Sequence, residues 1–243
     1  MTVSDLPVLS KIRFGRYSVE NESPHKICWV KYDEENSMIT EFIEDYRAFD
    51  AKEPMYDYGN PLYSVSNIDQ WFNSSDETWY TPAHPDDMPP SEAASSETAS
   101  TSYETHFGFL ALFRSWELKC MMVMTETVNT EVVERRVLLP RDTKVPAPIK
   151  RTTCSPECHV NSRQRDQLRS YWIIDEADAV GHVRRYSETE GVYNDRPFWG
   201  DIGVRPIIRL APDTLVSNDP VDGYYEVIEQ INEVEDFNIF DLI

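Results

Sequence analysis

The spacing of hydrophobic and polar residues predicts more strand than helix in the first quarter of the chain. Residues 11–32 contain two segments rich in branched and aromatic residues, "KIRFGRYSV" and "KICWVKY", separated by "ENESPH". Such segments on either side of a turn-forming sequence are typical of a β-hairpin. The next apolar pattern, at residues 36–49, fits a short helix and a strand followed by a turn equally well, and both alternatives stay open.

Two later segments have helical character. In "SNIDQWFNSSDETWY", Ile68, Trp71 and Phe72 share one face of a helix, and Ser66 stands where an N-cap is expected, with Asp69 three residues later. We therefore predict a short helix whose aromatic face is buried. Residues 106–124 form the most apolar segment, and its length favours a buried helix that gives way to a strand near Cys120.

The second half of the chain reads mainly as strands. Residues 132–140, "VVERRVLLP", predict a strand that ends at the proline. Three consecutive strands are expected within 168–176, 179–191 and 203–212, with Gly and Asp in the turns between them, and "GYYEVI" at 223–228 is a candidate final strand.

The stretch "WGDIGVRPIIRL", residues 199–210, combines glycines with a charged residue in an apolar strand. Gly203 permits a close approach of neighbouring atoms. Arg205 is expected to be structural, because a buried guanidinium needs several carboxylate or carbonyl partners. Pro206 lacks an N–H, which predicts a strand edge or a bulge. The candidate acidic partners of the arginine are Asp175, Glu176 and Asp201.

A chain of 243 residues with 40% hydrophobic content is long enough for one large domain with a sizeable core. We expect this domain to span residues 1–228. Two segments rich in Pro, Ser or basic residues, at about 81–103 and 141–167, are expected to be loop insertions. Residues 229–243 are expected to form an acidic, apolar arm beyond the domain.

The charge of the chain excludes some partners. A formal net charge of −20 disfavours binding to nucleic acid and to anionic membranes. The charge is uneven: residues 135–169 hold nine Lys or Arg against three acids, whereas residues 213–243 hold nine acids and no Lys or Arg. The two regions could attract each other within one molecule or between copies, and ordinary solvation of loops is an equally good explanation.

Metal and catalytic motifs are incomplete or missing. Cys154, Cys158 and His159 stand in "CSPECH", but no second pair of ligands completes a zinc site, so no metal is expected. Asp86 and Asp87 in "HPDD" are explained most simply as surface residues. No P-loop, G-x-S-x-G, H-E-x-x-H or G-x-G-x-x-G sequence is present. The sequence therefore predicts a protein without enzymatic activity and without a cofactor.

Several short motifs follow one another in a specific order. They are "FGRY", "ICWVKY", "SNIDQWFNS", "GFLALF", "VLLP", "SYWIIDE" and "GVRPIIRLAPDTLVS", and together they span roughly residues 11–228. This order resembles a family of uncharacterised bacterial and bacteriophage domains that close on a G-V-R-P strand. The closing pattern also looks like the end of C-type-lectin-like and formylglycine-generating folds. The resemblance implies an α+β, C-type-lectin-like fold, with a twisted antiparallel sheet, two or so helices and long irregular loops.

The same resemblance frames the expected function. Formylglycine-generating enzymes use a close pair of cysteines near the end of their fold, and this chain has no cysteine after Cys158, so that activity is not carried over. Lectin-like folds place recognition in their loops, where exposed aromatic side chains stack on sugars or anchor protein contacts. The candidate ligand-binding residues are Trp79, Tyr80, Tyr103, Tyr193 and Trp199, and the expected structural residues are Gly203, Arg205 and Trp172.

We therefore expect a structural or adhesion protein, most simply a bacteriophage virion component such as a capsid decoration, head-fibre or tail-associated subunit. Its partners would be other virion proteins or copies of itself, with host-surface glycan as a further partner. The alternatives are a bacterial carbohydrate- or protein-binding domain and, more distantly, a formylglycine-generating type of enzyme. No signal peptide or membrane span is apparent, which implies synthesis in the host cytoplasm. The residues expected to dock the arm on a partner are Phe237, Ile239, Phe240, Leu242 and Ile243.

Overall fold

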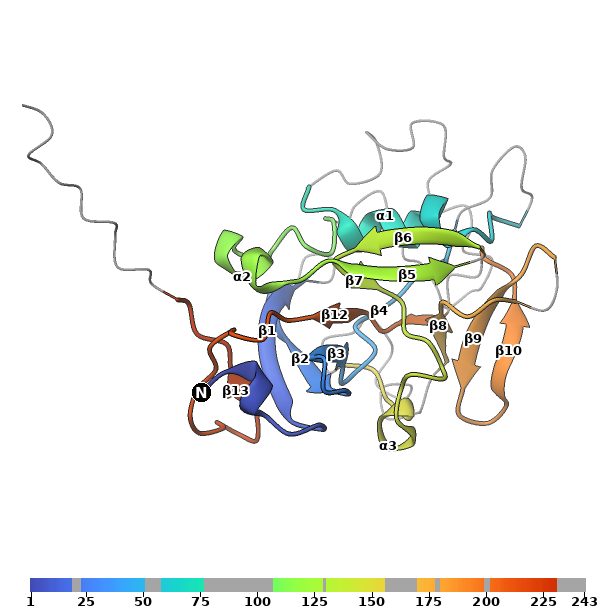
Figure 1. Cartoon of the computed structure of the whole chain (residues 1–243). Helices are drawn as coiled ribbons and strands as arrows, with labels where there is room; N and C mark the ends of the chain where they lie inside the picture. The colour runs from blue at the N-terminus through green and yellow to red at the C-terminus, as the bar shows by residue number, and fades with distance from the viewer. Residues whose placement is uncertain are drawn as a thin grey trace, which may run out of the picture.

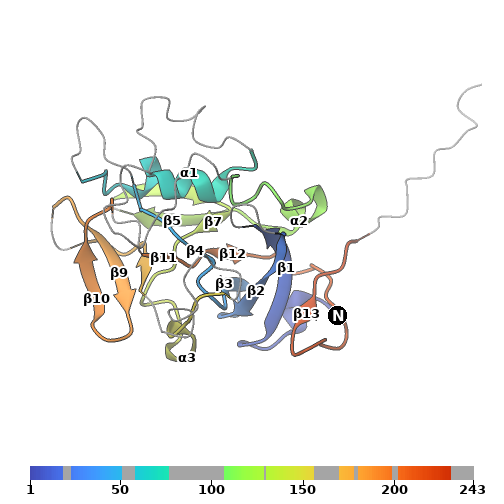
Figure 2. The same cartoon turned by 180° about the vertical axis from the view of Figure 1, so that it is seen from behind.

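The chain has an α+β fold in which sheets dominate and the helices are short (Figure 1). The structure is a computed structural model, and it describes residues 1–18, 23–50, 58–76, 107–128, 130–155, 170–177, 180–198 and 202–230. Among the described residues, no helix has the length and apolar content to cross a membrane. Figures 1 and 2 show α1 and the β5–β6 pair on one side of the molecule and α3 on the opposite side.

The larger sheet has six strands in the order β13-β1-β2-β3-β12-β7. Its first two antiparallel strands confirm the predicted hairpin, and the next segment, residues 36–49, forms strands rather than a helix. At the edge of this sheet, β13 runs parallel to β1, so the predicted final strand is confirmed as a two-residue strand. The strands are β1 (Lys11–Tyr17), β2 (His25–Lys31), β3 (Ser37–Thr40), β7 (Val137–Leu138), β12 (Ile207–Arg209) and β13 (Tyr225–Glu226).

The second sheet has five strands in the order β10-β9-β8-β11-β4, and β5 pairs with β6 as a separate two-stranded sheet. The strands predicted in the last third are present, but β10 was not predicted and lies between two of them in the chain. The strands are β4 (Asp45–Tyr46), β8 (Tyr171–Ile173), β9 (Val183–Ser187), β10 (Gly191–Asp195), β11 (Gly203–Val204), β5 (Met124–Val128) and β6 (Glu131–Arg135).

The chain changes sheets at Arg205 and Pro206. Strand β11 belongs to the five-stranded sheet, and β12 begins three residues after its end, inside the six-stranded sheet between β3 and β7. The expectation of a strand edge or bulge at Pro206 was wrong, because the proline lies in the break between two interior strands. No ladder hydrogen bond is lost there, and the Pro206 carbonyl still accepts a bond from the Thr40 N–H at 3.1 Å.

The predicted helix near residue 67 is confirmed as α1 (Asn67–Asn73). The Ser66 side chain accepts a hydrogen bond from the Asp69 N–H, so this serine is the N-cap. The other helices are α2 (Ser115–Cys120), α3 (Ala147–Lys150) and the 3₁₀ turns η1 (Val3–Asp5) and η2 (Tyr63–Val65).

The long buried helix predicted for residues 106–124 was wrong. Phe109, Leu110 and Phe113 enter the core from a series of tight turns closed by bonds such as Ala111 N–H to Gly108 C=O. Only the six residues of α2 are helical before β5 begins. The single strand predicted for 132–140 is also divided, because β6 pairs with β5 and β7 pairs with β12.

Aromatic side chains fill the core between the six-stranded sheet and α1. Trp29, Trp71 and Trp172 are fully buried, and the Trp172 indole N–H donates to the Arg47 carbonyl at 2.8 Å. The ring of Phe109 lies within 6 Å of the rings of Tyr17 and Trp71 in centroid distance. Full burial of each such side chain stabilises the fold by roughly 1.5–3 kcal/mol or more. This core is the rigid support for the surface described next.

Candidate functional site

Arg205 and Gly203 occupy tightly enclosed positions. Arg205 donates to the carbonyls of Thr40 at 2.9 Å and Ile149 at 2.6 Å, and its guanidinium carbon lies 5.3 Å from the centre of the Tyr171 ring. Of the predicted carboxylate partners, Asp175 and Glu176 make no ion pair with Arg205, and Asp201 lies outside the described residues. Carbonyls of the 40–41 and 149–150 segments surround the guanidinium.

Gly203 is a packing requirement. A Cβ atom at this position would lie 2.8 Å from side-chain carbons of Ile43 and 3.0 Å from the Ser170 carbonyl oxygen. Because real Cβ atoms do not approach heavy atoms so closely, the strand tolerates only glycine without a shift of its neighbours. Together with Trp172 and Arg205, this residue positions the strands and contacts no open surface.

Of the predicted aromatic binding residues, the structure describes only Tyr193. Tyr193 lies on β10, where the Arg185 guanidinium carbon is 4.1 Å from the centre of its ring and covers one face. Trp79, Tyr80, Tyr103 and Trp199 lie outside the described residues, as do Asp86, Asp87, Cys158, His159 and the arm residues Phe237, Ile239, Phe240, Leu242 and Ile243.

The one described member of the "CSPECH" segment that could bind metal is enclosed. Cys154 is buried, and its Sγ lies 2.8 Å from the Tyr46 hydroxyl. Within the described ranges, no group of three or more His, Cys, Asp or Glu side chains could hold a metal ion.

A groove that the sequence reading missed lies on the outer face of β1 and β2. It begins with a β-bulge in the "FGRY" motif. Arg13 pairs with Cys28 and Arg16 pairs with Lys26, so three steps along β1 match two steps along β2. Residues three apart in a regular strand point to opposite faces, whereas the extra residue lets both arginines point outward. Arg13, Arg16, Lys26 and Cys28 therefore share the outer face.

Gly15 is the residue that makes this bulge. Its φ is +68°, a conformation that side-chain-bearing residues rarely adopt. A Cβ atom here would lie 2.2 Å from the Phe113 ring, which packs under the bulge. On either side of the bulge, Phe14 and Tyr17 point inward and are buried. The motif thus contributes to both faces of the sheet, because its aromatic residues pack in the core while its arginine faces solvent.

Two adjoining pockets make up this surface, which we call the β1–β2 groove. The larger has a volume of about 560 Å³ and the smaller about 210 Å³, and both touch Arg13, Lys26 and Glu226. The larger pocket is also lined by His25, Cys28, Phe42, Glu44, Ser155 and Tyr224. The smaller is also lined by Phe14, Gly15, Arg16, Arg114, Trp116, Glu117 and Val227.

Glu226, at the boundary of the two pockets, neutralises part of the positive charge. Its carboxylate lies 2.5 Å from the Lys26 ammonium and 3.5 Å from the Arg13 guanidinium. Arg13 also stacks on Tyr224, with the guanidinium carbon 4.4 Å from the ring centre. Among the described residues, the side chains of Arg16 and Arg114 make no ion pair and no hydrogen bond.

The larger pocket contains a thiol and a histidine–carboxylate pair. His25 Nε2 lies 3.2 Å from Glu44 Oε2, and the Glu44 side chain is 2% exposed. Burial raises the pKa of the Cys28 thiol, and the negative charge of Glu44 acts in the same direction, whereas a hydrogen bond from Arg13 opposes them. At neutral pH the thiol therefore stays protonated, which makes it a poor nucleophile.

One signal in the sequence could have revealed this groove. The "FGRY" motif carries a glycine inside a strand, and such a glycine often marks a bulge that re-aims the next side chain. The contributions of Arg114 and Glu226 could not be read in this way, because these residues are about 100 and 210 positions away. Neither a family model, nor a curated protein, nor a solved structure matches this chain.

Proposed function

We propose that this chain is a recognition protein without enzymatic activity, and that the β1–β2 groove is its binding site. The observation that carries the proposal is a pair of adjoining pockets of about 560 and 210 Å³ built from charged and aromatic side chains on a rigid sheet. Pockets of this size take small ligands or short parts of larger ones. The raised pKa of Cys28 argues against thiolate chemistry, so binding explains the groove better than catalysis.

We further propose a C-type-lectin-like domain that belongs to a bacteriophage virion. Two features support the domain type. The six-stranded sheet includes β13 beside β1, and Thr2 forms a bridge with Leu215, so residues far apart in the sequence are joined. The virion assignment is supported by the motif order and by the acidic, apolar segment after Gln230, whose apolar residues suit docking on another subunit.

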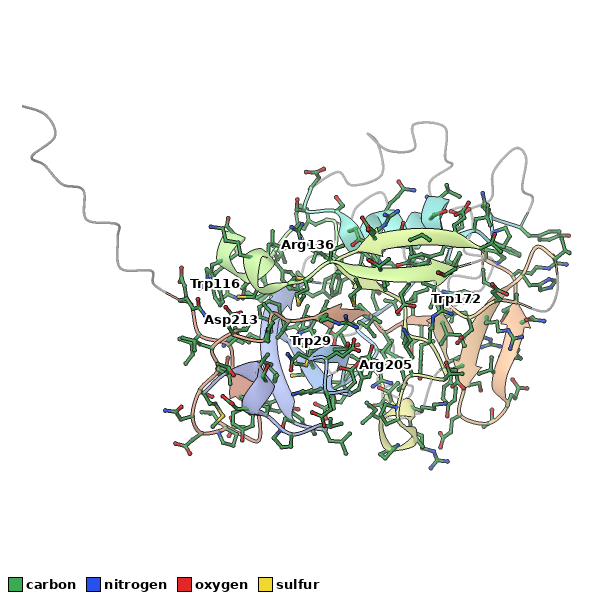
Figure 3. The ribbon with its side chains drawn as sticks, viewed as in Figure 1. Trp29, Trp116, Arg136, Trp172, Arg205 and Asp213 are labelled. Carbon is green, nitrogen blue, oxygen red and sulfur yellow. The ribbon has the colours of Figure 1, made fainter. Side chains whose placement is uncertain are left out.

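A binding experiment on whole bacteria tests the recognition function. Fluorescently labelled full chain is incubated with host-type bacterial cells, and bound protein is measured by flow cytometry. Saturable binding by the full chain, and its loss when Arg16 and Arg114 are both changed to Ala, is the expected result. Arg136→Ala is the matched control, because Arg136 is an exposed arginine outside the groove (Figure 3). Cell binding that is unchanged in the double variant would contradict a role for the groove.

Removal of residues 231–243 tests the docking segment separately. The cut follows Gln230, whose side chain donates to the Asp213 carbonyl at 3.0 Å, so the described fold is retained. Particles assembled with the truncated chain should lack it when their protein content is measured by mass spectrometry. Normal incorporation of the truncated chain would contradict docking through Phe237, Ile239, Phe240, Leu242 and Ile243.

The second candidate function is a carbohydrate- or protein-binding domain of a bacterium, without a particle. The aromatic contribution of Phe42 and Tyr224 to the larger pocket favours it, because such rings stack on sugars. Cell binding by the full chain together with its absence from purified particles would favour this alternative. A formylglycine-generating type of activity is not supported, because no disulfide joins the described cysteines Cys28, Cys120 and Cys154 and the chain has no cysteine after Cys158.

A further inference from the structure

We propose that the smaller pocket of the β1–β2 groove binds the anionic group of an acidic saccharide, a sugar that carries a carboxylate, phosphate or sulfate. The inference rests on the proposed recognition function and names the ligand class of the same site. It is argued from the placement of four cations, the engagement of the nearby carboxylates, and the shape of the pocket.

Four cationic side chains line the pocket from β1, β2 and the start of α2. The bulge directs Arg13 and Arg16 to the same side as Lys26, and Arg114 joins them from the residue that precedes α2. Guanidinium groups donate paired hydrogen bonds that match the geometry of carboxylate and phosphate oxygens. A local excess of cations is unusual in a chain whose formal net charge is −20, where a solvated acidic surface is the default.

The carboxylates that line the pocket are already engaged. Glu117 accepts a hydrogen bond from the Arg114 backbone N–H at 2.6 Å, and Glu226 lies between Lys26 and Arg13. Neither carboxylate forms an ion pair with Arg114 or Arg16, whose side chains have no partner within the described part of the chain. An anion bound between these two arginines would supply the missing negative charge.

The remaining surface of the pocket suits a sugar ring. Its apolar lining includes Trp116 and Val227, and an aromatic side chain packs well against the C–H face of a sugar. The indole N–H of Trp116 is buried and makes no hydrogen bond among the described residues. Figure 3 shows Trp116, a residue of α2, at the same end of the molecule as Asp213.

The volumes favour a saccharide over an acidic peptide. About 210 Å³ holds a single ring with its substituent, and the adjoining 560 Å³ gives room for neighbouring sugar units. A peptide such as residues 231–243 would need to place several large apolar side chains, whereas the larger pocket presents His25, Glu44 and Lys26 beside the rings of Phe42 and Tyr224. Hydroxyl groups of a sugar match such a mixed lining of donors and acceptors.

The test measures binding of defined probes to the full chain by NMR or calorimetry. The probes are glucuronate, glucose 6-phosphate, glucose 6-sulfate, glucose and inorganic phosphate, at low and high salt. At least one of the three anionic sugars should bind at least about tenfold more tightly than glucose, because a charge-assisted hydrogen bond is stronger than a neutral one. That sugar should also bind more tightly than inorganic phosphate and lose affinity at high salt. The three anionic sugars distinguish the carboxylate, phosphate and sulfate as the recognised group.

Variants make the result specific to the pocket. The double change Arg16→Ala and Arg114→Ala should reduce affinity for the preferred sugar by about tenfold or more. Arg136→Ala should leave it unchanged, and a thermal melt of each variant verifies that it is folded. The paired change of both arginines to Lys should restore part of the affinity, because charge is kept while the planar geometry is lost.

Four outcomes would overturn the inference. They are equal binding of glucose and all three anionic sugars, equal binding of the double variant and the parent, binding of inorganic phosphate as tight as that of the preferred sugar, and competition by a peptide of residues 231–243 that binds more tightly than any sugar. Failure of the recognition function is distinguishable, because it would leave sugar binding in solution intact while the chain did not bind to cells.

Discussion

Lys31, Arg47 and Arg205 are cations inside the fold, whereas the cations of the β1–β2 groove face outward. The three internal side chains are at most 1% exposed. Lys31 donates to the carbonyls of Leu6 at 2.7 Å and Val3 at 3.2 Å. Arg47 donates to Asp45 at 2.7 Å and stacks on Trp71 at 4.3 Å. Each internal cation thus has fixed partners.

The groove cations differ in what surrounds them. Lys26 and Arg13 share one carboxylate, Glu226, and Arg16 and Arg114 have none among the described residues. A charge that the protein itself has satisfied stabilises the fold, whereas a charge left for an external partner is available for binding. The comparison teaches that the partners of an arginine, rather than its presence in a strand, decide which role it has.

The largest effect is expected at the internal cation between the two sheets. Arg205→Ala should lower the free energy of unfolding by about 3–5 kcal/mol, because it leaves a cavity and several carbonyls without a donor. Chemical denaturation measures the change. Arg209→Ala is the control, since that arginine is paired with the exposed Glu35 and should cost at most about 1 kcal/mol. An equal decrease in the free energy of unfolding of both variants would contradict the distinction between internal and surface cations.

The next effect concerns the bulge that aims the groove cations. Gly15→Ala should destabilise the fold by about 2–4 kcal/mol, because both the positive φ and the contact with Phe113 disfavour a Cβ atom. Gly191→Ala is a matched control: its φ is +73° and no atom lies within 4 Å of the position that a Cβ would occupy, so only the conformational cost of about 1 kcal/mol is expected. Similar denaturation midpoints for the two variants would show that Phe113 does not pack under the bulge.

A smaller effect is expected on the reactivity of Cys28. Because its pKa is raised, the protonated form is favoured on folding, and the thiolate forms only as the pH rises above the ordinary thiol range. At pH 7.5 the folded chain should react with a maleimide several-fold more slowly at Cys28 than the same chain in denaturant, and the rate should increase with pH. Peptide mass spectrometry assigns the modified residue. A rate in the folded chain equal to or above that in denaturant would indicate an activated thiol and would favour catalysis.

The smallest effect on stability is expected for the groove arginines. Changing Arg16 and Arg114 together to Ala should alter the free energy of unfolding by less than about 0.5 kcal/mol per site, since neither side chain has a partner to lose among the described residues. A thermal or chemical melt of the double variant measures this. A decrease of several kcal/mol in the free energy of unfolding would show that these arginines stabilise the fold as the internal cations do, which would contradict the contrast between the two groups.

The strand pattern could be predicted where local chemistry decides the structure. Alternation and turn residues were enough for the β1–β2 hairpin, and Ser66 with Asp69 was enough for the start of α1. The helix predicted for residues 106–124 was wrong because the apolar content of a segment indicates burial and does not by itself specify a helix. In the structure, the aromatic rings of this segment fill the core from a series of tight turns.

The candidate site could not be predicted from local sequence patterns. Its cations come from β1, β2 and the start of α2, and its carboxylate comes from β13, so only the tertiary arrangement brings them together. Arg205 was predicted to be a structural residue with carboxylate or carbonyl partners, and carbonyls bind it. Which carbonyls these are could not be predicted, because backbone groups carry no signature in the sequence. Pro206 was read as an edge marker, and it instead marks the passage from one sheet to the other.

That passage has a consequence for how the molecule loses its structure. One continuous segment supplies an interior strand to each sheet, and only two residues separate the two strands. Unfolding of one sheet should therefore displace a strand of the other. The segment couples the two sheets, so heat or denaturant should unfold both in a single cooperative step.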